Sequence, residues 1–121
     1  MYAVLRKSWS SSTAYKSCQS EWVSEDPSYG QCAITATLVY DMFGGSIHRI
    51  RVEGGGTHYF NKITGQYVDL TREQFDLYNI EVAYEPNETM QREYCCKNPD
   101  TNARYRQLQR NIIAYLKNNE D

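Results

Sequence analysis

The stretch from Cys32 to Gly45 constrains the fold more than any other part of the sequence. A loop-forming segment, 26–30, which contains both Pro and Gly, precedes it. Apolar residues then recur at the spacing of one helical face, at Ala36, Val39, Tyr40 and Phe43. Gly44-Gly45 follows, and glycine readily adopts the left-handed conformation that ends helices. The pattern predicts a helix over residues 32–43 that begins at Cys32.

Shorter patterns flank this helix. Residues 2–9 have enough apolar positions for a short helix, and residues 46–53 alternate weakly, as a strand does. Residues 57–61 and 66–70 are rich in aromatic and β-branched side chains and are separated by 62–65. Two such runs around a short connection are typical of a β-hairpin.

The second half of the chain adds further expected elements. Thr71-Arg72-Glu73-Gln74 has the form of a capping box and predicts a short helix through Tyr78. Residues 80–84 are consistent with another strand. A final helix, capped by Asp100 or Thr101, would carry an apolar face of Tyr105, Leu108, Ile112 and Leu116. Together the elements predict an α+β fold, with residues 1–121 forming one domain.

Charge and hydropathy exclude several classes of protein. The net charge is −2 and the 13 Lys and Arg residues are scattered, which argues against a nucleic-acid binder. No run approaches the ~18 apolar residues of a membrane helix, and the first residues lack the pattern of a secretion signal. We therefore expect a cytoplasmic protein with no membrane partner, whose four cysteines are thiols.

Cys32 is the first candidate for chemistry. The amide groups at a helix N-terminus stabilise a thiolate, and the thiolate is the reactive form of cysteine. Gly30 would let the backbone turn tightly in front of the sulfur, and the backbone N–H of Cys32 would face an oxyanion formed beside it. A lone cysteine is more often a buried structural residue, so a second signal is needed.

The predicted hairpin supplies that signal. If residues 62–65 form a four-residue loop, Asn61 opposes Gln66 and His58 opposes Asp69 on the same face of the hairpin. A carboxylate beside an imidazole holds one tautomer and favours the charged ring, which is the partner that a thiol nucleophile needs. A register shift of one residue would separate the two side chains.

Three other patterns give weaker signals. His48 is an alternative base, but no carboxylate lies in matched register with it. A zinc site from Cys32, His58, Cys95 and Cys96 is disfavoured, since structural zinc sites space their cysteine pairs two to four residues apart. The glycines 54–56 lack the lysine of a phosphate-binding loop and are typical of a flexible turn.

These residues resemble known families. Tyr29-Gly30-Gln31-Cys32, His58-Tyr59-Phe60-Asn61 and Asp69-Leu70-Thr71 are similar to the segments around the nucleophile, base and carboxylate of transglutaminases, which share the order Cys, His, Asp with the wider papain-like group. Over nearly the whole chain the sequence resembles the YunG-like family of small bacterial proteins. That resemblance runs through Trp9-Ser10, Gly30-Gln31-Cys32, Gly44-Gly45, His58-Tyr59-Phe60-Asn61, Asp69-Leu70-Thr71 and Arg104-Tyr105.

The resemblance implies a minimal transglutaminase- or papain-like core, because the gaps from Cys32 to His58 and from His58 to Asp69 are short. It implies Cys32 as nucleophile, His58 as base and Asp69 as orienter. Gln31 is a candidate oxyanion donor. Ala33 stands where transglutaminases have a tryptophan after the nucleophile. For the separate aromatic residue that helps to hold their oxyanion, the upstream Trp9 and Trp22 are the only candidates.

The sequence therefore predicts a cysteine-dependent amide hydrolase or acyltransferase, whether peptidase, deamidase or transglutaminase-like. Its partner would be an amide-containing substrate, and it would require no metal or organic cofactor. The alternative is a non-catalytic binding or scaffold protein that keeps a cysteine-protease-like fold. The sequence leaves the substrate and the oligomeric state open.

Overall fold

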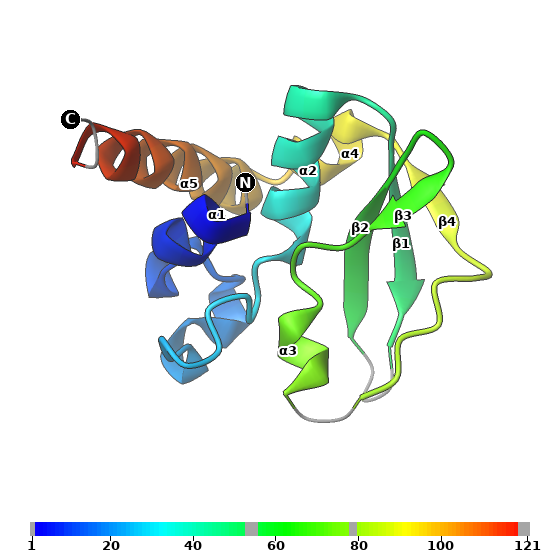
Figure 1. The fold of residues 1–121 in the computed structure, drawn as a ribbon, viewed down its shortest axis with the longest axis horizontal. Coiled ribbons are helices and arrows are strands. Elements are labelled where there is room, and N and C mark those ends of the chain that lie inside the picture. The colour runs from blue at the N-terminus through cyan, green and yellow to red at the C-terminus, as the bar shows by residue number, and fades with distance from the viewer. Residues whose placement is uncertain (1, 53–55, 78–79, 119–121) are drawn as a thin grey trace.

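A computed structural model describes residues 2–52, 56–77 and 80–118 of the chain, apart from the side chains of Cys95 and Cys96. The described part is an α+β structure with a small antiparallel sheet, as the sequence predicts (Figure 1). None of its helices combines the length and hydrophobicity needed to cross a membrane. The order of the elements is α1 (Tyr2–Ser8), η1 (Ser11–Thr13), η2 (Lys16–Glu21), α2 (Cys32–Phe43), β1 (Ser46–Arg51), β2 (Thr57–Ile63), β3 (Gln66–Val68), α3 (Glu73–Asp76), β4 (Glu88–Met90), α4 (Arg92–Cys96) and α5 (Pro99–Asn118).

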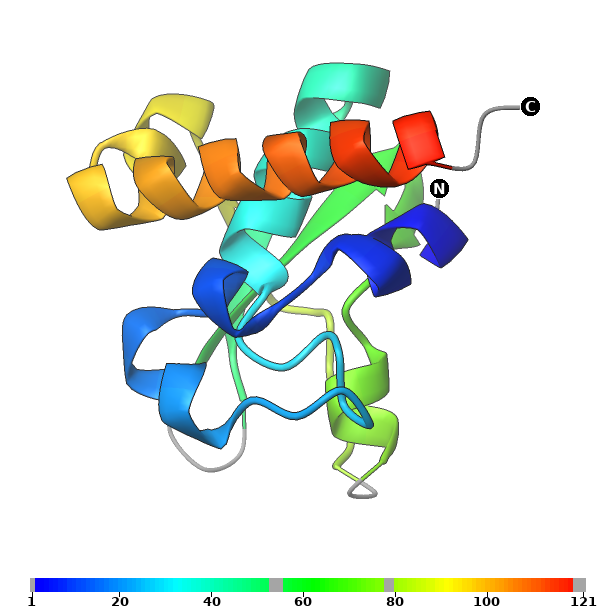
Figure 2. The same ribbon diagram turned by 90° about the vertical axis from the view of Figure 1, so that its left-hand side faces the viewer.

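Helix α2 lies at the centre of the molecule, between the sheet and the helices α1 and α5 (Figures 1 and 2). Ile34 and Leu38 of α2 face a core that is shared with α1 and α5. Ala36 of α2 packs on Ile47 of β1 in a second cluster that faces the sheet. Because both sides of α2 are covered, its position is set by two cores at once.

The bounds of α2 agree with the prediction, since it begins at Cys32 and ends at Phe43. Gly44 and Gly45 both have positive φ angles, of 76° and 78°. The chain leaves the helix through these two glycines and enters β1 directly at Ser46. The loop before Cys32 and the two glycines after Phe43 therefore predict both ends of this helix correctly.

The sheet has the strand order β3-β2-β1-β4, and its hairpin differs in register from the prediction. The turn between β2 and β3 has two residues, Thr64 and Gly65, both with positive φ, which is the favoured type for a two-residue hairpin. Ile63 therefore pairs with Gln66 and Asn61 pairs with Val68. The predicted four-residue loop and the pairing of Asn61 with Gln66 are wrong by two residues.

Two other predicted elements near the hairpin differ in the structure. The segment 80–84 forms no strand, and the fourth strand is instead β4, which pairs with β1. The helix after the hairpin spans only Glu73–Asp76, while Tyr78 lies outside the described residues. In a capping box the backbone N–H of Gln74 would donate to the Thr71 hydroxyl. It donates instead to Ser28 Oγ, at 3.0 Å. The predicted capping box is therefore wrong.

Helix α5 begins at Pro99, before the predicted caps. Asn98 is the capping residue, because its Oδ1 accepts hydrogen bonds from the backbone N–H groups of Asp100 and Thr101 at 2.8 and 3.4 Å. An Asn followed by Pro is a known signal for a helix start, since proline fits the first helical position. The predicted cap at Asp100 or Thr101 is therefore wrong by two or three residues.

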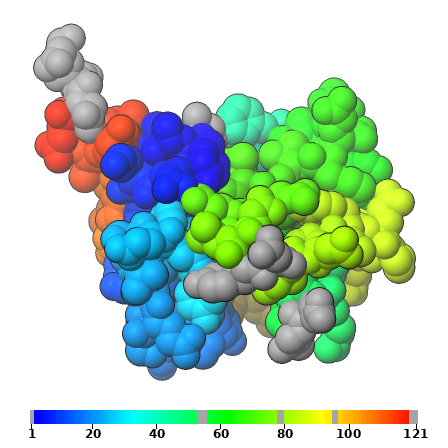
Figure 3. All heavy atoms as spheres, turned by 60° about the horizontal axis from the view of Figure 1, so that its bottom comes forward, coloured from blue at the N-terminus to red at the C-terminus, as the bar shows by residue number. Residues whose placement is uncertain are grey.

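The loop before Cys32 is held against the start of α3. Ser28 is buried, and its hydroxyl donates to the Thr71 carbonyl oxygen at 3.3 Å while it accepts from Gln74. Figure 3 shows this end of the molecule, where the segment 15–30 (blue to cyan) lies beside residues 71–76 (light green). These bonds tie the segment that precedes the thiol to the segment that follows Asp69.

Candidate functional site

Cys32 is the first residue of α2, as the sequence predicts. The preceding residue, Gln31, provides no side-chain cap, so the N–H groups of the first turn keep their capacity to bind an anion. The Cys32 side chain is half-buried, and its Sγ lies 3.9 Å from the Thr57 carbonyl oxygen. That contact is long for a hydrogen bond, so it restrains the thiol only weakly.

His58 lies on β2 and is buried, with 1% of its side chain exposed. Its Nε2 is 2.7 Å from Asp69 Oδ2, and its ring packs on the Phe75 ring in a T-shaped arrangement at a centroid distance of 4.6 Å. Its other nitrogen, Nδ1, is also buried and has no hydrogen-bond partner among the described residues. One nitrogen of the imidazole is thus paired with a carboxylate, and the other is left without a partner among the described residues.

Asp69 follows β3, and its carboxylate accepts four hydrogen bonds. Its Oδ1 accepts from both the backbone N–H and the hydroxyl of Thr71, each at 3.2 Å, in an Asx-type turn. Its Oδ2 accepts from His58 and, at 2.7 Å, from the Tyr84 hydroxyl. The carboxylate is held at both oxygens, so it fixes the orientation of the imidazole.

The structure confirms that His58 and Asp69 meet, although not through the predicted pairing. The hairpin register is shifted by two residues, and side chains alternate between faces with a period of two. A shift of two therefore leaves both residues on the same face, where a shift of one would have separated them. Asp69 then reaches His58 from just beyond the last residue of β3.

Electrostatics favour the protonated form of His58. Burial by itself lowers the pKa of the imidazole, but the hydrogen bond with Asp69, the nearby Cys32 thiol and the charges of both groups raise the pKa of His58 to about 9. Burial works against the charge of Asp69 too, yet the bond from His58 holds the pKa of that carboxyl below its usual value. At neutral pH the pair is an imidazolium and a carboxylate.

Cys32 is the second residue that acts on His58. The thiol lies close enough to the imidazole to raise the pKa of His58, although Nδ1 forms no hydrogen bond with it in the structure. Since Nε2 is taken by Asp69, the nitrogen available to the sulfur is Nδ1. The three residues proposed from the sequence are therefore one constellation, in the order thiol, imidazole, carboxylate.

Gln31 does not join this constellation. Its side chain is fully buried, its Oε1 accepts from the Thr13 hydroxyl at 2.7 Å, and its Nε2 donates to the Ser10 carbonyl oxygen at 3.1 Å. The amide thus ties the start of α2 to η1 and points away from the thiol. The structure gives Gln31 a supporting contact, and its role as an oxyanion donor stays a prediction.

The other sequence candidates use their polar groups elsewhere. The indole N–H of Trp9 donates to Thr35 Oγ1 at 3.0 Å, and that of Trp22 donates to the Pro27 carbonyl oxygen at 3.1 Å. His48, the alternative base, bonds Ser46 Oγ through Nε2 and Asn87 Oδ1 through Nδ1. Among the described residues, these hydrogen-bond partners of His48 are neutral side chains.

The sequence offered no route to Tyr84. This residue comes from the irregular segment that was predicted as a strand, and its hydroxyl shares Asp69 Oδ2 with His58. The Tyr84 ring packs on Phe60 and Tyr67, at centroid distances of 4.9 and 5.9 Å. Asp69-Leu70-Thr71, by contrast, does carry a signal, because Asp two residues before Thr is typical of an Asx turn.

The zinc alternative required Cys95 and Cys96, whose side chains lie outside the described residues. Within the part of the chain that the structure describes, no group of three or more His, Cys, Asp and Glu side chains is arranged to hold a metal ion. Cys18 and Cys32 are free thiols.

The charged His58 makes stability depend on pH in a defined direction. Below pH ~6.5 both folded and unfolded chains carry the proton, and between pH ~6.5 and 9 only the folded chain does. We expect the free energy of unfolding to fall by about 3 kcal/mol across this window, measured by urea denaturation. The slope should persist in His48→Gln and disappear in His58→Gln. A wild-type profile that is flat over this window contradicts the assignment.

Comparison with known proteins gives a family and no activity. A family model described as YunG protein matches residues 1–117. The chain is 42% identical, over 72 residues, to the "Uncharacterized protein YunG" of Bacillus subtilis (strain 168). That alignment covers 60% of this chain and 57% of the relative, so the chain spans little more than half the length of the curated protein it matches. No solved structure matches the chain.

Proposed function

We propose that this chain, which belongs to the YunG family, is a cysteine-dependent amide hydrolase or acyltransferase. Cys32 would be the nucleophile, His58 the general base and acid, and Asp69 the residue that orients His58. The observation that carries the proposal is the buried His58, which bonds Asp69 through Nε2 and leaves Nδ1 unpaired on the side of the Cys32 thiol. A buried nitrogen without a hydrogen-bond partner lowers the stability of the fold. Such an atom in a native structure is therefore a candidate for a functional role.

The reaction would begin from a Cys32 thiolate beside the His58 imidazolium, in which the proton of the thiol resides on Nδ1. The sulfur attacks the carbonyl carbon of an amide, and the imidazolium returns its proton to the nitrogen as the C–N bond breaks. The amine or ammonia leaves and a thioester remains on Cys32. Water, or a second amine, then loses a proton to His58 and attacks the thioester, which breaks the C–S bond, releases the acyl group and restores the Cys32 thiolate and the His58 imidazolium.

The donors for the oxyanion would come from the backbone. The N–H of Cys32 and its neighbours in the first turn of α2 have no intrahelical acceptors, and no side chain caps them. The side chains of Trp9 and Trp22 are engaged with Thr35 and Pro27. We therefore assign the oxyanion to the helix N-terminus, where the helix dipole also favours negative charge.

A minimal transglutaminase- or papain-like core is part of the same proposal. Its support is the chain order Cys, His, Asp together with the arrangement of a thiol on a helix and an imidazole on a neighbouring strand.

The test uses p-nitrophenyl acetate as a general acyl donor, with nitrophenolate release and intact-protein mass measured together. We expect an acetyl group on Cys32, followed by its hydrolysis and repeated turnover. Cys32→Ser should abolish the acetylation, while Cys18→Ser, which removes the other described free thiol, should leave it unchanged. His58→Ala should slow turnover at least about 100-fold, the usual contribution of a general base.

Two outcomes oppose the proposal. If acetylation occurs equally in Cys32→Ser, the nucleophile has been misassigned. If Cys32 is acetylated no faster than a thiol in an unfolded peptide and the thioester is never hydrolysed, the alternative reading of a non-catalytic scaffold takes precedence. If the protein turns over, glutamine-containing peptides distinguish the three possible reactions. Deamidation releases ammonia, crosslinking joins an added amine to the peptide, and peptidase activity shortens the peptide.

A further inference from the structure

A second surface lies at the opposite end of α2 from Cys32. It consists of two adjoining hollows, which share Gln109 and Ile113 on α5. The first hollow has a volume of about 530 Å³ and the second about 470 Å³. None of Cys32, His58 and Asp69 lines either hollow, and α2 separates them by roughly 15 Å at 1.5 Å per residue. The inference is therefore independent of the proposed catalytic site.

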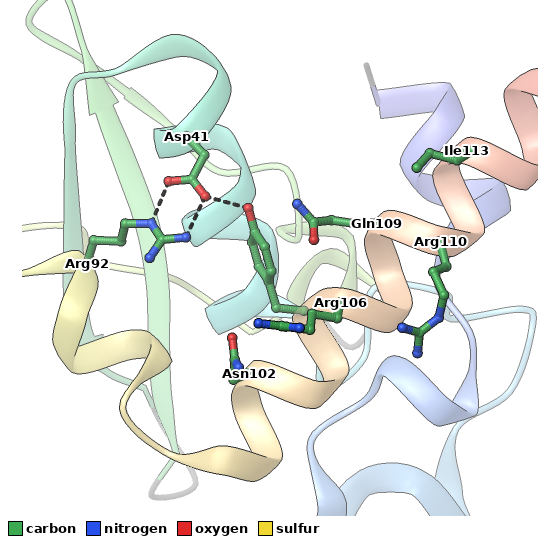
Figure 4. Close-up of a pocket in the computed structure, with 8 residues that line it drawn as sticks. Asp41, Arg92, Asn102, Arg106, Gln109, Arg110 and Ile113 are labelled. Atoms are coloured by element: carbon green, nitrogen blue, oxygen red, sulfur yellow. Dashed lines mark hydrogen bonds and ion pairs between the residues drawn. The ribbon is translucent and has the colours of Figure 1, made fainter.

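The first hollow is polar and carries excess positive charge. Arg92 is neutralised there, because it binds both oxygens of Asp41 at 2.6 and 2.8 Å, and Tyr105 donates to the same carboxylate (Figure 4). Arg106 and Arg110 add two more guanidinium groups from successive turns of α5 (Figure 4). Asp41 is the one acidic residue among those lining the hollow, so the two additional charges are not balanced within it.

The second hollow is apolar and open. It runs along the end of α2 and the C-terminal half of α5, where large hydrophobic side chains are about half exposed: Met42, Phe43, Ile113 and Leu116. The first half of α5 is covered, since Tyr105 and Leu108 are buried in the core. Four half-exposed hydrophobic residues beside one another mark a surface that a partner can cover.

We propose that the two hollows together bind an amphipathic, acidic segment of another protein, with its apolar side chains on Ile113 and Leu116 and its carboxylates on Arg106 and Arg110. Helix-in-groove recognition uses this combination of apolar anchors and charge complementarity. Guanidinium groups suit carboxylates because they can bind both oxygens at once. The openness of the groove favours a segment of polypeptide over a fatty acid, whose chain requires an enclosed cavity.

A second copy of this chain fits the surface less well. In a two-fold contact each copy presents the same patch to the other. The arginines of one copy would then lie near the arginines of the second, and like charges across an interface are costly. The charge of the surface therefore selects an acidic partner different from the chain itself.

The test is selection of random peptides displayed on phage against the full immobilised chain. We expect the selected peptides to combine hydrophobic residues at helical spacing with Glu or Asp. Measured by fluorescence anisotropy, their affinity should drop about tenfold or more in the double variant Arg106→Glu/Arg110→Glu, and similarly in Leu116→Ser. Lys117→Glu is the matched control, because Lys117 is an exposed cation of α5 that lines neither hollow, and it should change affinity less than about twofold.

Charge reversal gives a second measurement that does not depend on loss of binding. A selected peptide with its acidic residues replaced by Lys should bind the Arg106→Glu/Arg110→Glu variant better than it binds the wild type. Selected peptides without acidic residues, affinities unaffected by both variants, or a dimer detected by light scattering that is dispersed by Leu116→Ser would each overturn the proposal.

Discussion

Replacing Asp69 with alanine is expected to lower the free energy of unfolding by about 4 kcal/mol at neutral pH. The side chain is only 5% exposed and its partner His58 only 1% exposed, so the variant leaves an imidazole buried without its counter-charge. The Tyr84 hydroxyl and the Thr71 hydroxyl and N–H lose their acceptor as well. Breaking a buried pair from one side costs far more than the net contribution of the intact pair, since the remaining groups stay desolvated.

Asp76→Ala provides the matched control for this prediction. Asp76 pairs with Arg72 in the same region, but both side chains are more than half exposed. Water replaces such a pair almost without loss, so the control should cost about 0.5 kcal/mol or less. Urea denaturation at pH 7 compares the two variants. Equal free energies of unfolding for Asp69→Ala and Asp76→Ala would contradict a buried His58–Asp69 ion pair.

The second large effect is expected for Gly45→Ala. Gly45 joins α2 to β1 with a φ of 78°, and a Cβ built there would collide with the Lys62 carbonyl oxygen on β2 and lie 3.2 Å from Ile63 Cγ1. The obstacle is backbone in the sheet, which cannot rotate away as a side chain can. We expect a loss of about 4 kcal/mol or more, and a drop in Tm of roughly 12 to 20 °C.

Gly65→Ala separates the collision from the backbone strain. Gly65 has nearly the same φ, 79°, but nothing lies within 4 Å of its Cβ position. Only the left-handed backbone is penalised there, at a cost of about 1 to 2 kcal/mol. Thermal unfolding followed by circular dichroism measures both variants. Equal losses at the two positions would contradict the close packing of the α2–β1 junction against β2.

Much of the site could be predicted because its signals are local. The start of α2 is marked by a loop with Pro27 and Gly30, and its end by two glycines, so Cys32 was placed correctly at a helix N-terminus. The two aromatic runs predict the hairpin itself. The predicted register is wrong because Thr64-Gly65 forms a two-residue turn in place of the predicted loop over residues 62–65. His58 and Asp69 are still predicted on the same face of the hairpin, because side chains alternate between faces with a period of two residues.

The rest of the site depends on tertiary contacts that leave no periodic signal. Tyr84 reaches Asp69 from a segment without regular structure, fifteen residues further along the chain. Gln31 precedes Cys32 directly in the sequence, yet its side chain contacts Ser10 and Thr13. Adjacency in sequence says little about direction at a helix start, because successive side chains project about 100° apart.

The most direct test of the proposed thiol–imidazole pair is the rate of iodoacetamide labelling at Cys32 at pH 7, followed by peptide mass spectrometry in the wild type and in His58→Ala. Cys18, labelled in the same samples, serves as the internal reference. We expect wild-type Cys32 to be labelled faster than Cys18, and His58→Ala to remove that difference without changing the labelling of Cys18, because the imidazole stabilises the reactive thiolate. Labelling of Cys32 that is no faster than that of Cys18 and does not respond to His58→Ala would contradict the thiol–imidazole pair.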